Sequence, residues 1–195
     1  MSILVLTSDT LIGTPATGNL EYNGQFFGTD SNASRAQMQR ITQGTAVTAS
    51  GTSVDFTGLP AWVKRITVMF QGITTNGTSP PIMRLGTSAG FVTSGYASGG
   101  IYTGASTGSG NRTDSLLICG NAFDAAATAH GHAILTNISG NAWVQSFVLG
   151  QSNTAYGLMG GGSISLAGTL DRVRITTANG TDAFDAGSIN ILYEG

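Results

Sequence analysis

The sequence predicts an all-β protein, an antiparallel, jelly-roll-like β-sandwich preceded by a short N-terminal hairpin. Three observations lead to this fold class. Short β-branched runs recur from about Asp55 onward, and the segments between them are rich in glycine and in Asn-Gly pairs, which favour tight turns. No segment keeps a long apolar face at helical spacing, so the helical crossovers that an α/β fold needs are missing from the pattern.

Composition supports one ordered main domain with a short appended segment. The chain has 195 residues, 29 of them glycine, with 41% hydrophobic and 9% charged residues and a net charge of −2. This hydrophobic content is too high for a disordered chain, and the positive charge is too low for a nucleic-acid partner. The opening MSILVL is too short for a signal sequence, no apolar run reaches membrane-spanning length, and the lone Cys119 implies no disulfide framework. We therefore expect neither a nucleic-acid partner nor membrane insertion.

The first part of the chain, residues 1–45, is expected to be an attachment or oligomerisation segment. It contains a strand-like Leu20-Glu21-Tyr22, the turn signal Asn23-Gly24 and an aromatic strand. A lone hairpin is marginal in water, so it should pack on a partner surface. Residues 32–40 fit two helical turns about as well as a non-helical segment.

The second part, residues 46–195, is expected to form the sandwich. In residues 65–73, Ile66, Val68 and Phe70 alternate with polar neighbours, as in a half-buried strand. Further strands are predicted at residues 82–85, 115–119, 132–138, 142–149, 163–166, 173–177 and 188–193. A single helical turn, capped by Asn121, is predicted at residues 122–129.

Two glycine-rich segments leave alternatives open. Residues 86–111 interleave aromatic side chains with Gly, Ser and Thr, which predicts either short edge strands or an exposed functional loop. Residues 160–162 are three consecutive glycines without the Lys-Ser/Thr of a phosphate loop, so they predict a turn or a close approach of two backbones.

The composition also argues against an enzyme. The chain has two histidines, one cysteine and one lysine, so few groups titrate near neutral pH. Asp182 and Asp185 lie in a turn-like segment, where local hydrogen bonds are a simpler role than paired glycosidase carboxylates. We expect a non-enzymatic protein with no catalytic residues.

Two longer blocks carry a resemblance to a known family. They are SVDFTGLPAWVKRITVMF at residues 53–70, and LAGTLDRVRIT at residues 166–176 with FDAGSINI at residues 184–191. These blocks resemble the C-terminal domains of tail fibre or minor structural proteins of tailed bacteriophages and prophages. The element GTPATGNLEYNG at residues 13–24 is similar to short segments of phage appendage proteins.

The resemblance implies a trimeric, β-rich virion protein. The chain has no heptad run or shaft repeat, so it would serve as a fibre tip or adaptor in a tail appendage that takes part in host-cell adsorption. The alternative is a capsid decoration, cement or head-fibre protein that stabilises the shell. The implied partners are two further copies of the chain, other phage virion proteins, and a host surface glycan or protein.

The candidate site residues are aromatic, basic and histidine side chains. The candidates for receptor binding are Phe91, Tyr96 and Tyr102. The candidates for subunit interfaces are Tyr22, Phe26, Phe27, Trp62, Arg172 and Arg174. His130 and His132 share one face of a predicted strand, so three such pairs around a trimer axis could bind a metal ion, the alternative being a polar surface pair. No other cofactor is expected.

Overall fold

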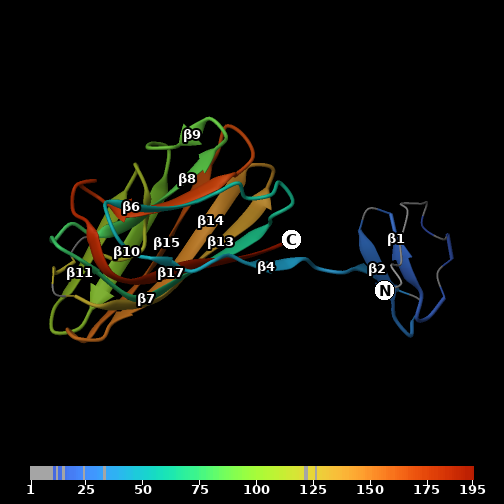
Figure 1. Cartoon of the computed structure of the whole chain (residues 1–195), viewed down its shortest axis with the longest axis horizontal. Helices are drawn as coiled ribbons and strands as arrows, with labels where there is room; N and C mark the ends of the chain where they lie inside the picture. The colour runs from blue at the N-terminus through green and yellow to red at the C-terminus, as the bar shows by residue number, and fades with distance from the viewer. Residues whose placement is uncertain are drawn as a thin grey trace. The chain divides into compact units, whose positions relative to one another are not determined.

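The structure, a computed structural model, describes residues 11, 13–14, 16–23, 25–32, 34–120, 123–125 and 127–195. The chain divides into two compact units, unit 1 at Met1–Arg40 and unit 2 at Ile41–Gly195 (Figure 1). The described residues contain no α-helix, and therefore none that is long and apolar enough to cross a membrane.

Unit 1 contains a three-stranded antiparallel sheet in the order β1-β2-β3. Its strands are β1 (Leu20–Tyr22), β2 (Phe26–Thr29) and β3 (Arg35–Gln37). The first two form the predicted hairpin. The third corrects the helical alternative for residues 32–40, because this segment pairs with β2 and the Arg35 guanidinium is held by Glu21 of β1 at 2.7 Å.

Unit 2 is a β-sandwich, and its larger layer is a nine-stranded antiparallel sheet. The order is β11-β10-β15-β14-β13-β7-β17-β4, with β5 also paired to β17. The strands are β4 (Ile41–Gln43), β5 (Val47–Thr48), β7 (Arg65–Thr75), β10 (Ala97–Thr103), β11 (Thr107–Arg112), β13 (Ala129–Ser139), β14 (Ala142–Gln151), β15 (Tyr156–Ser165) and β17 (Phe184–Glu194).

The smaller layer of unit 2 is a five-stranded sheet in the order β12-β8-β16-β6, with β9 also paired to β8. Its strands are β6 (Ser53–Thr57), β8 (Pro81–Thr87), β9 (Gly90–Phe91), β12 (Leu116–Leu117) and β16 (Arg172–Thr177). In Figure 1, β6, β8 and β9 lie in the upper layer and β7 and β17 in the lower one.

The core of unit 2 lies between these layers and follows the alternation of the sequence. On β7, Ile66, Val68 and Phe70 point inward and are buried, and on β16 Val173 and Ile175 do the same from the opposite side. Because the strand period is two, every other residue faces the core, and the remaining side chains point away from it.

The three glycines of residues 160–162 lie inside strand β15 and do not form a turn. A Cβ atom at Gly160 would lie 2.3 Å from the Gly99 carbonyl oxygen and 2.6 Å from the Phe147 ring. This is the close backbone approach, the second of the two alternatives. The chain uses glycine here because any side chain would collide with β10.

Residues 86–111 are partly strand, since β10 and β11 form a hairpin at the edge of the larger sheet. The predicted helical turn at residues 122–129 is a different case. Residues 121, 122 and 126 lie outside the described residues, and Ala129 already belongs to β13.

Candidate functional site

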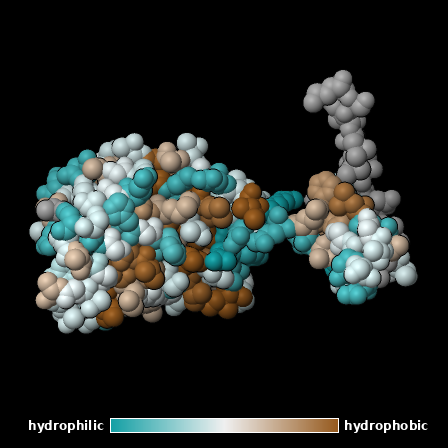
Figure 2. All heavy atoms as spheres, turned by 90° about the horizontal axis from the view of Figure 1, so that it is seen from below, coloured by the Kyte–Doolittle hydropathy of each residue, from teal (hydrophilic) through white to brown (hydrophobic). Residues whose placement is uncertain are grey.

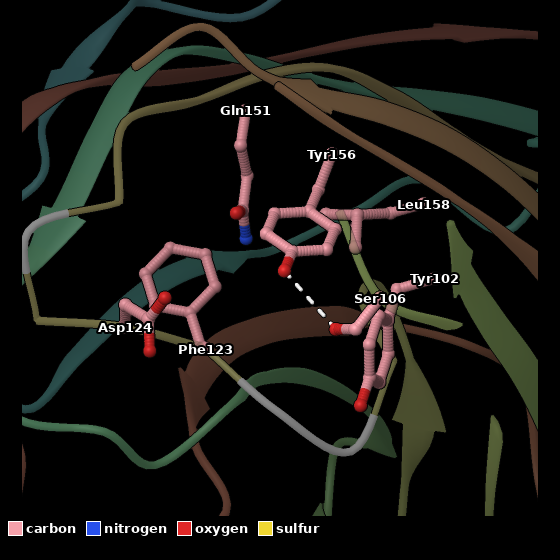
Figure 3. A pocket seen from close by; sticks show the side chains of 7 residues that line it. All are labelled: Tyr102, Ser106, Phe123, Asp124, Gln151, Tyr156 and Leu158. Carbon is pink, nitrogen blue, oxygen red and sulfur yellow. Dashed lines mark hydrogen bonds between the residues drawn. The ribbon is translucent and has the colours of Figure 1, made fainter. Parts of the chain in front are cut away.

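A pocket of about 130 Å³ lies at one end of the larger sheet, where β14 ends and β15 begins beside the end of β10. Its described lining residues are mostly aromatic and polar: Tyr102, Ser106, Phe123, Asp124, Gln151, Tyr156 and Leu158 (Figure 3). We call it the tyrosine pocket.

Two tyrosines from neighbouring strands form one wall of the tyrosine pocket. Tyr102 lies on β10 and Tyr156 begins β15, and their rings meet edge to face with centroids 5.9 Å apart. Edge-to-face contact is a favoured arrangement of aromatic rings. The pairing of β10 with β15 therefore decides the position of both rings.

Glycines make the space that these rings occupy. A Cβ atom at Gly108 would lie 2.4 Å from the Tyr102 ring, and one at Gly120 would lie 2.5 Å from it. A Cβ atom at Gly104 would lie 2.6 Å from the Tyr156 ring. The glycine-rich sequence around Tyr102 is therefore a packing requirement of this wall.

Polar groups complete the tyrosine pocket. The hydroxyls of Ser106 and Tyr156 are hydrogen-bonded at 3.1 Å, and the Gln151 carbonyl oxygen accepts a hydrogen bond of 2.6 Å from Thr154. In Figure 3 the amide end of Gln151 points between the Phe123 and Tyr156 rings, and the exposed Asp124 carboxylate lies beside Phe123. The pocket thus offers hydrogen-bond donors and acceptors next to aromatic surface.

The size and charge of the tyrosine pocket limit what it can do. Pockets that enclose a whole small molecule usually hold about 300–1,000 Å³, so a pocket of about 130 Å³ fits one ring of a larger ligand. Asp124 is the only ionisable carboxyl group among the described lining residues, which also include no histidine, lysine or arginine. The described lining thus lacks the second carboxylate that glycoside hydrolysis generally requires.

Of the three predicted receptor-binding residues, only Tyr102 lines the tyrosine pocket. The prediction for Tyr96 is wrong, because this side chain is 3% exposed and belongs to the core. Its hydroxyl accepts a hydrogen bond from the Leu85 N–H at 2.9 Å and lies 3.0 Å from the Val92 carbonyl oxygen, to which it can donate. Burial raises the pKa of Tyr96 to about 12.

Phe91 lies on the other side of the sandwich, against arginines. The Arg174 guanidinium carbon is 4.2 Å from the centre of the Phe91 ring and that of Arg172 is 5.8 Å from it. Arg174 also makes two hydrogen bonds to Asp55, of 2.7 and 2.6 Å, which raise the pKa of the guanidinium. Both arginines share the outer side of the smaller sheet, and their role in a subunit interface stays a prediction.

The aromatic interface candidates fall in both units. Trp62 packs against the core of unit 2 and its ring lies 5.7 Å from that of Tyr193. In unit 1 the rings of Tyr22 and Phe26 are 5.0 Å apart, Phe26 is exposed and Phe27 is half-buried. Their contacts with other chains stay a prediction.

The two histidines are exposed on β13, and His130 is held by its own chain. The Gly72 N–H donates a hydrogen bond to His130 Nδ1 at 3.1 Å, and His130 Nε2 lies 3.3 Å from the Ser152 hydroxyl. A metal ion on His130 would have to displace one of these partners. Among the described residues, no group of three or more His, Cys, Asp and Glu side chains is placed to hold a metal ion.

Sequence reasoning did not find Tyr156, Phe123, Asp124 or Gln151. These residues lie on segments far from Tyr102 in the chain and meet it only through sheet pairing and loop packing. The one available signal was the glycine spacing around Tyr102.

Comparison with known proteins adds no relative. No family model matches the chain, and neither curated proteins nor solved structures yield a significant match. The resemblance to phage virion proteins therefore stays an expectation based on the residues quoted above.

Proposed function

We propose that this chain is a non-enzymatic structural protein of a bacteriophage virion, part of a homotrimeric tail appendage that binds a host surface glycan at the tyrosine pocket. The observation that carries the binding role is the pocket wall of Tyr102 and Tyr156, with hydrogen-bonding groups beside it.

A saccharide suits this chemistry better than an anion. A sugar ring presents apolar C–H groups on its face and hydroxyls at its edge, which complement an aromatic wall next to the Asp124 carboxylate and the Gln151 amide. The described lining has no cation to attract a phosphate or carboxylate ligand. The small volume favours one sugar of an extended chain.

The virion context rests on the resemblance of residues 53–70, 166–176 and 184–191. A tail fibre tip or adaptor combines attachment with adsorption, and the division into unit 1 and unit 2 suits this pair of tasks. In this proposal unit 1 attaches to other virion proteins while unit 2 trimerises and binds the glycan.

The same separate unit 1 favours a second candidate, a capsid decoration or head-fibre protein whose short N-terminal unit lies on the shell. Gold labelling of intact virions separates the candidates. Label on the tail supports the appendage, and label confined to the head supports the alternative.

The binding role is tested with pocket variants in a host-cell binding assay. Tyr102→Ala and Tyr156→Ala should each weaken binding about tenfold or more, as expected when a central aromatic contact is removed. Purified surface polysaccharide should compete with the cells for the wild-type protein.

The matched control is Phe91→Ala, which removes a half-buried aromatic ring from the opposite layer and should leave binding unchanged. Each variant is first checked for wild-type circular dichroism and unfolding midpoint. Unchanged binding by both folded pocket variants would reject the tyrosine pocket as the site.

A further inference from the structure

The larger sheet of unit 2 has an outer side, facing away from the smaller sheet, that carries two transverse rows without aspartate, glutamate, lysine or arginine. In the first row the strand registers align Ile101, Met159, Val148, His132 and Met69. In the neighbouring row they align Gly99, Gly161, Ser146, Ile134 and Thr67. We call these two rows, with their continuations onto β11 and β17, the neutral face.

The neutral face is both apolar and open. Val148, Ile101 and Met159 are 57%, 46% and 45% exposed, and they are neighbours on three adjacent strands. Seen from below Figure 1, unit 2 shows several brown hydrophobic patches among pale and teal, hydrophilic residues (Figure 2). The residues of β11 and β17 that continue these two rows carry no charge. The next row holds one ion pair, Arg65 with Glu194, at 3.3 Å.

The outer side of the smaller sheet carries charged side chains in place of uncharged ones. Asp55, Arg174 and Arg84 are aligned there across three strands, and Arg84 also pairs with Asp114 at 3.2 Å. Charged side chains usually face water, whereas the centres of protein interfaces are depleted of them. In unit 2, Asp55, Arg84 and Arg174 thus lie on this side, whereas the Arg65–Glu194 pair lies on the outer side of the larger sheet.

The neutral face together with the next row approaches the extent of a stable interface. Seven strands about 4.8 Å apart give a width of about 34 Å, and the two rows of the neutral face, about 6.6 Å apart, give about 440 Å². The row of the Arg65–Glu194 pair adds about 220 Å² at its margin. The area is thus about 660 Å², against about 800 Å² on each partner of a standard interface.

We propose that the neutral face is the contact surface between copies of this chain. A second copy brings the same neutral surface, so the contact buries apolar side chains such as Val148 without removing an unpaired charge from water. The proposal assigns a contact surface to the homotrimer of the proposed function and rests on that function for the number of copies.

The test is the mass of the full chain in solution, measured by light scattering. The wild-type protein should have about three times the 19.8 kDa of one chain. Val148→Glu places a charge at the middle of the neutral face on an exposed position, so unit 2 should fold normally and the mass should fall about threefold. Met159→Glu should act in the same way from the neighbouring strand.

The control is Thr57→Glu, which adds the same charge on the charged side, in register with Arg172, and should keep the wild-type mass. A wild-type mass of one chain would overturn the proposal, and so would an unchanged mass for both folded glutamate variants. Saccharide binding at the tyrosine pocket is measured separately for each variant. If Tyr102→Ala keeps both the mass and the glycan binding, the binding site is wrong and the contact surface stands.

Discussion

The Tyr96 hydroxyl accepts the hydrogen bond of a backbone N–H of β8, as the carbonyl of a paired strand would. The variant Tyr96→Phe removes this hydroxyl without leaving a cavity. The variant leaves the Leu85 N–H without its acceptor at 2.9 Å, in a residue that is fully buried. A buried polar group without a partner costs about 1–3 kcal/mol. The Val92 carbonyl belongs to a half-buried residue and can turn to water. We therefore expect a loss of about 2 kcal/mol of unfolding free energy.

Urea unfolding of the wild type and the variant measures this loss. For a protein of this size about 2 kcal/mol corresponds to a fall in Tm of about 4–8 °C. Tyr156→Phe is the matched control, because its hydroxyl makes one exposed hydrogen bond to Ser106 and its loss should change stability by about 0.5 kcal/mol or less. A change at Tyr96 as small as that of the control would refute the reasoning.

A pH series gives an independent readout for Tyr96. Because burial raises its pKa from 10.0 to about 12, the folded protein holds this proton more tightly than the unfolded chain. The resulting stability is fully present below pH 10 and is lost as the pH rises toward 12. The wild type should therefore lose its advantage over Tyr96→Phe in this range, and a constant difference would contradict the assignment.

Two further predictions concern charge and backbone packing. Asp114→Asn should lower stability at pH 7 by about 1 kcal/mol, reduced for partial exposure of the ion pairs, because Arg112 and Arg84 lose their carboxylate partner. The hydrogen bond from Arg112 lowers the pKa of Asp114 from 3.8 to about 2, so this stability is present above pH 4 and is lost as the pH falls toward 2; the acid unfolding of the variant should lack that loss. Gly160→Ala should destabilise unit 2 by about 1–3 kcal/mol, because its Cβ would meet the Gly99 carbonyl, whereas Gly150→Ala, with no atom within 4 Å, should be neutral or slightly stabilising in thermal unfolding.

Strands with one apolar face could be predicted from the sequence, and those without one could not. On β7, Ile66, Val68 and Phe70 reveal the buried face directly. On β10 the inward positions include Gly100, where a Cβ atom would lie 2.8 Å from the Phe147 ring. The alternation of apolar and polar residues on β10 is therefore not visible in the sequence, because the Phe147 ring fills the space that a side chain at Gly100 would occupy.

Pairing partners explain the remaining differences. Residues 35–37 become strand β3 because β2 offers them a partner, which local propensity does not show. Tyr96 lies in the same glycine-rich segment as Tyr102, yet it turns inward to Leu85 while Tyr102 reaches the tyrosine pocket. Composition alone does not separate a core tyrosine from a binding tyrosine.

The strand order of the larger sheet also has a consequence for folding. Strand β17 lies between β7 and β4, so it fills the position next to one edge of the sheet with residues more than 100 positions away from both partners. Until β17 has left the ribosome, the paired edges of β7 and β4 have no neighbour there. Non-local pairings of this kind slow folding to milliseconds or longer. During synthesis, therefore, β7 is an exposed edge that can capture the same strand from another nascent copy.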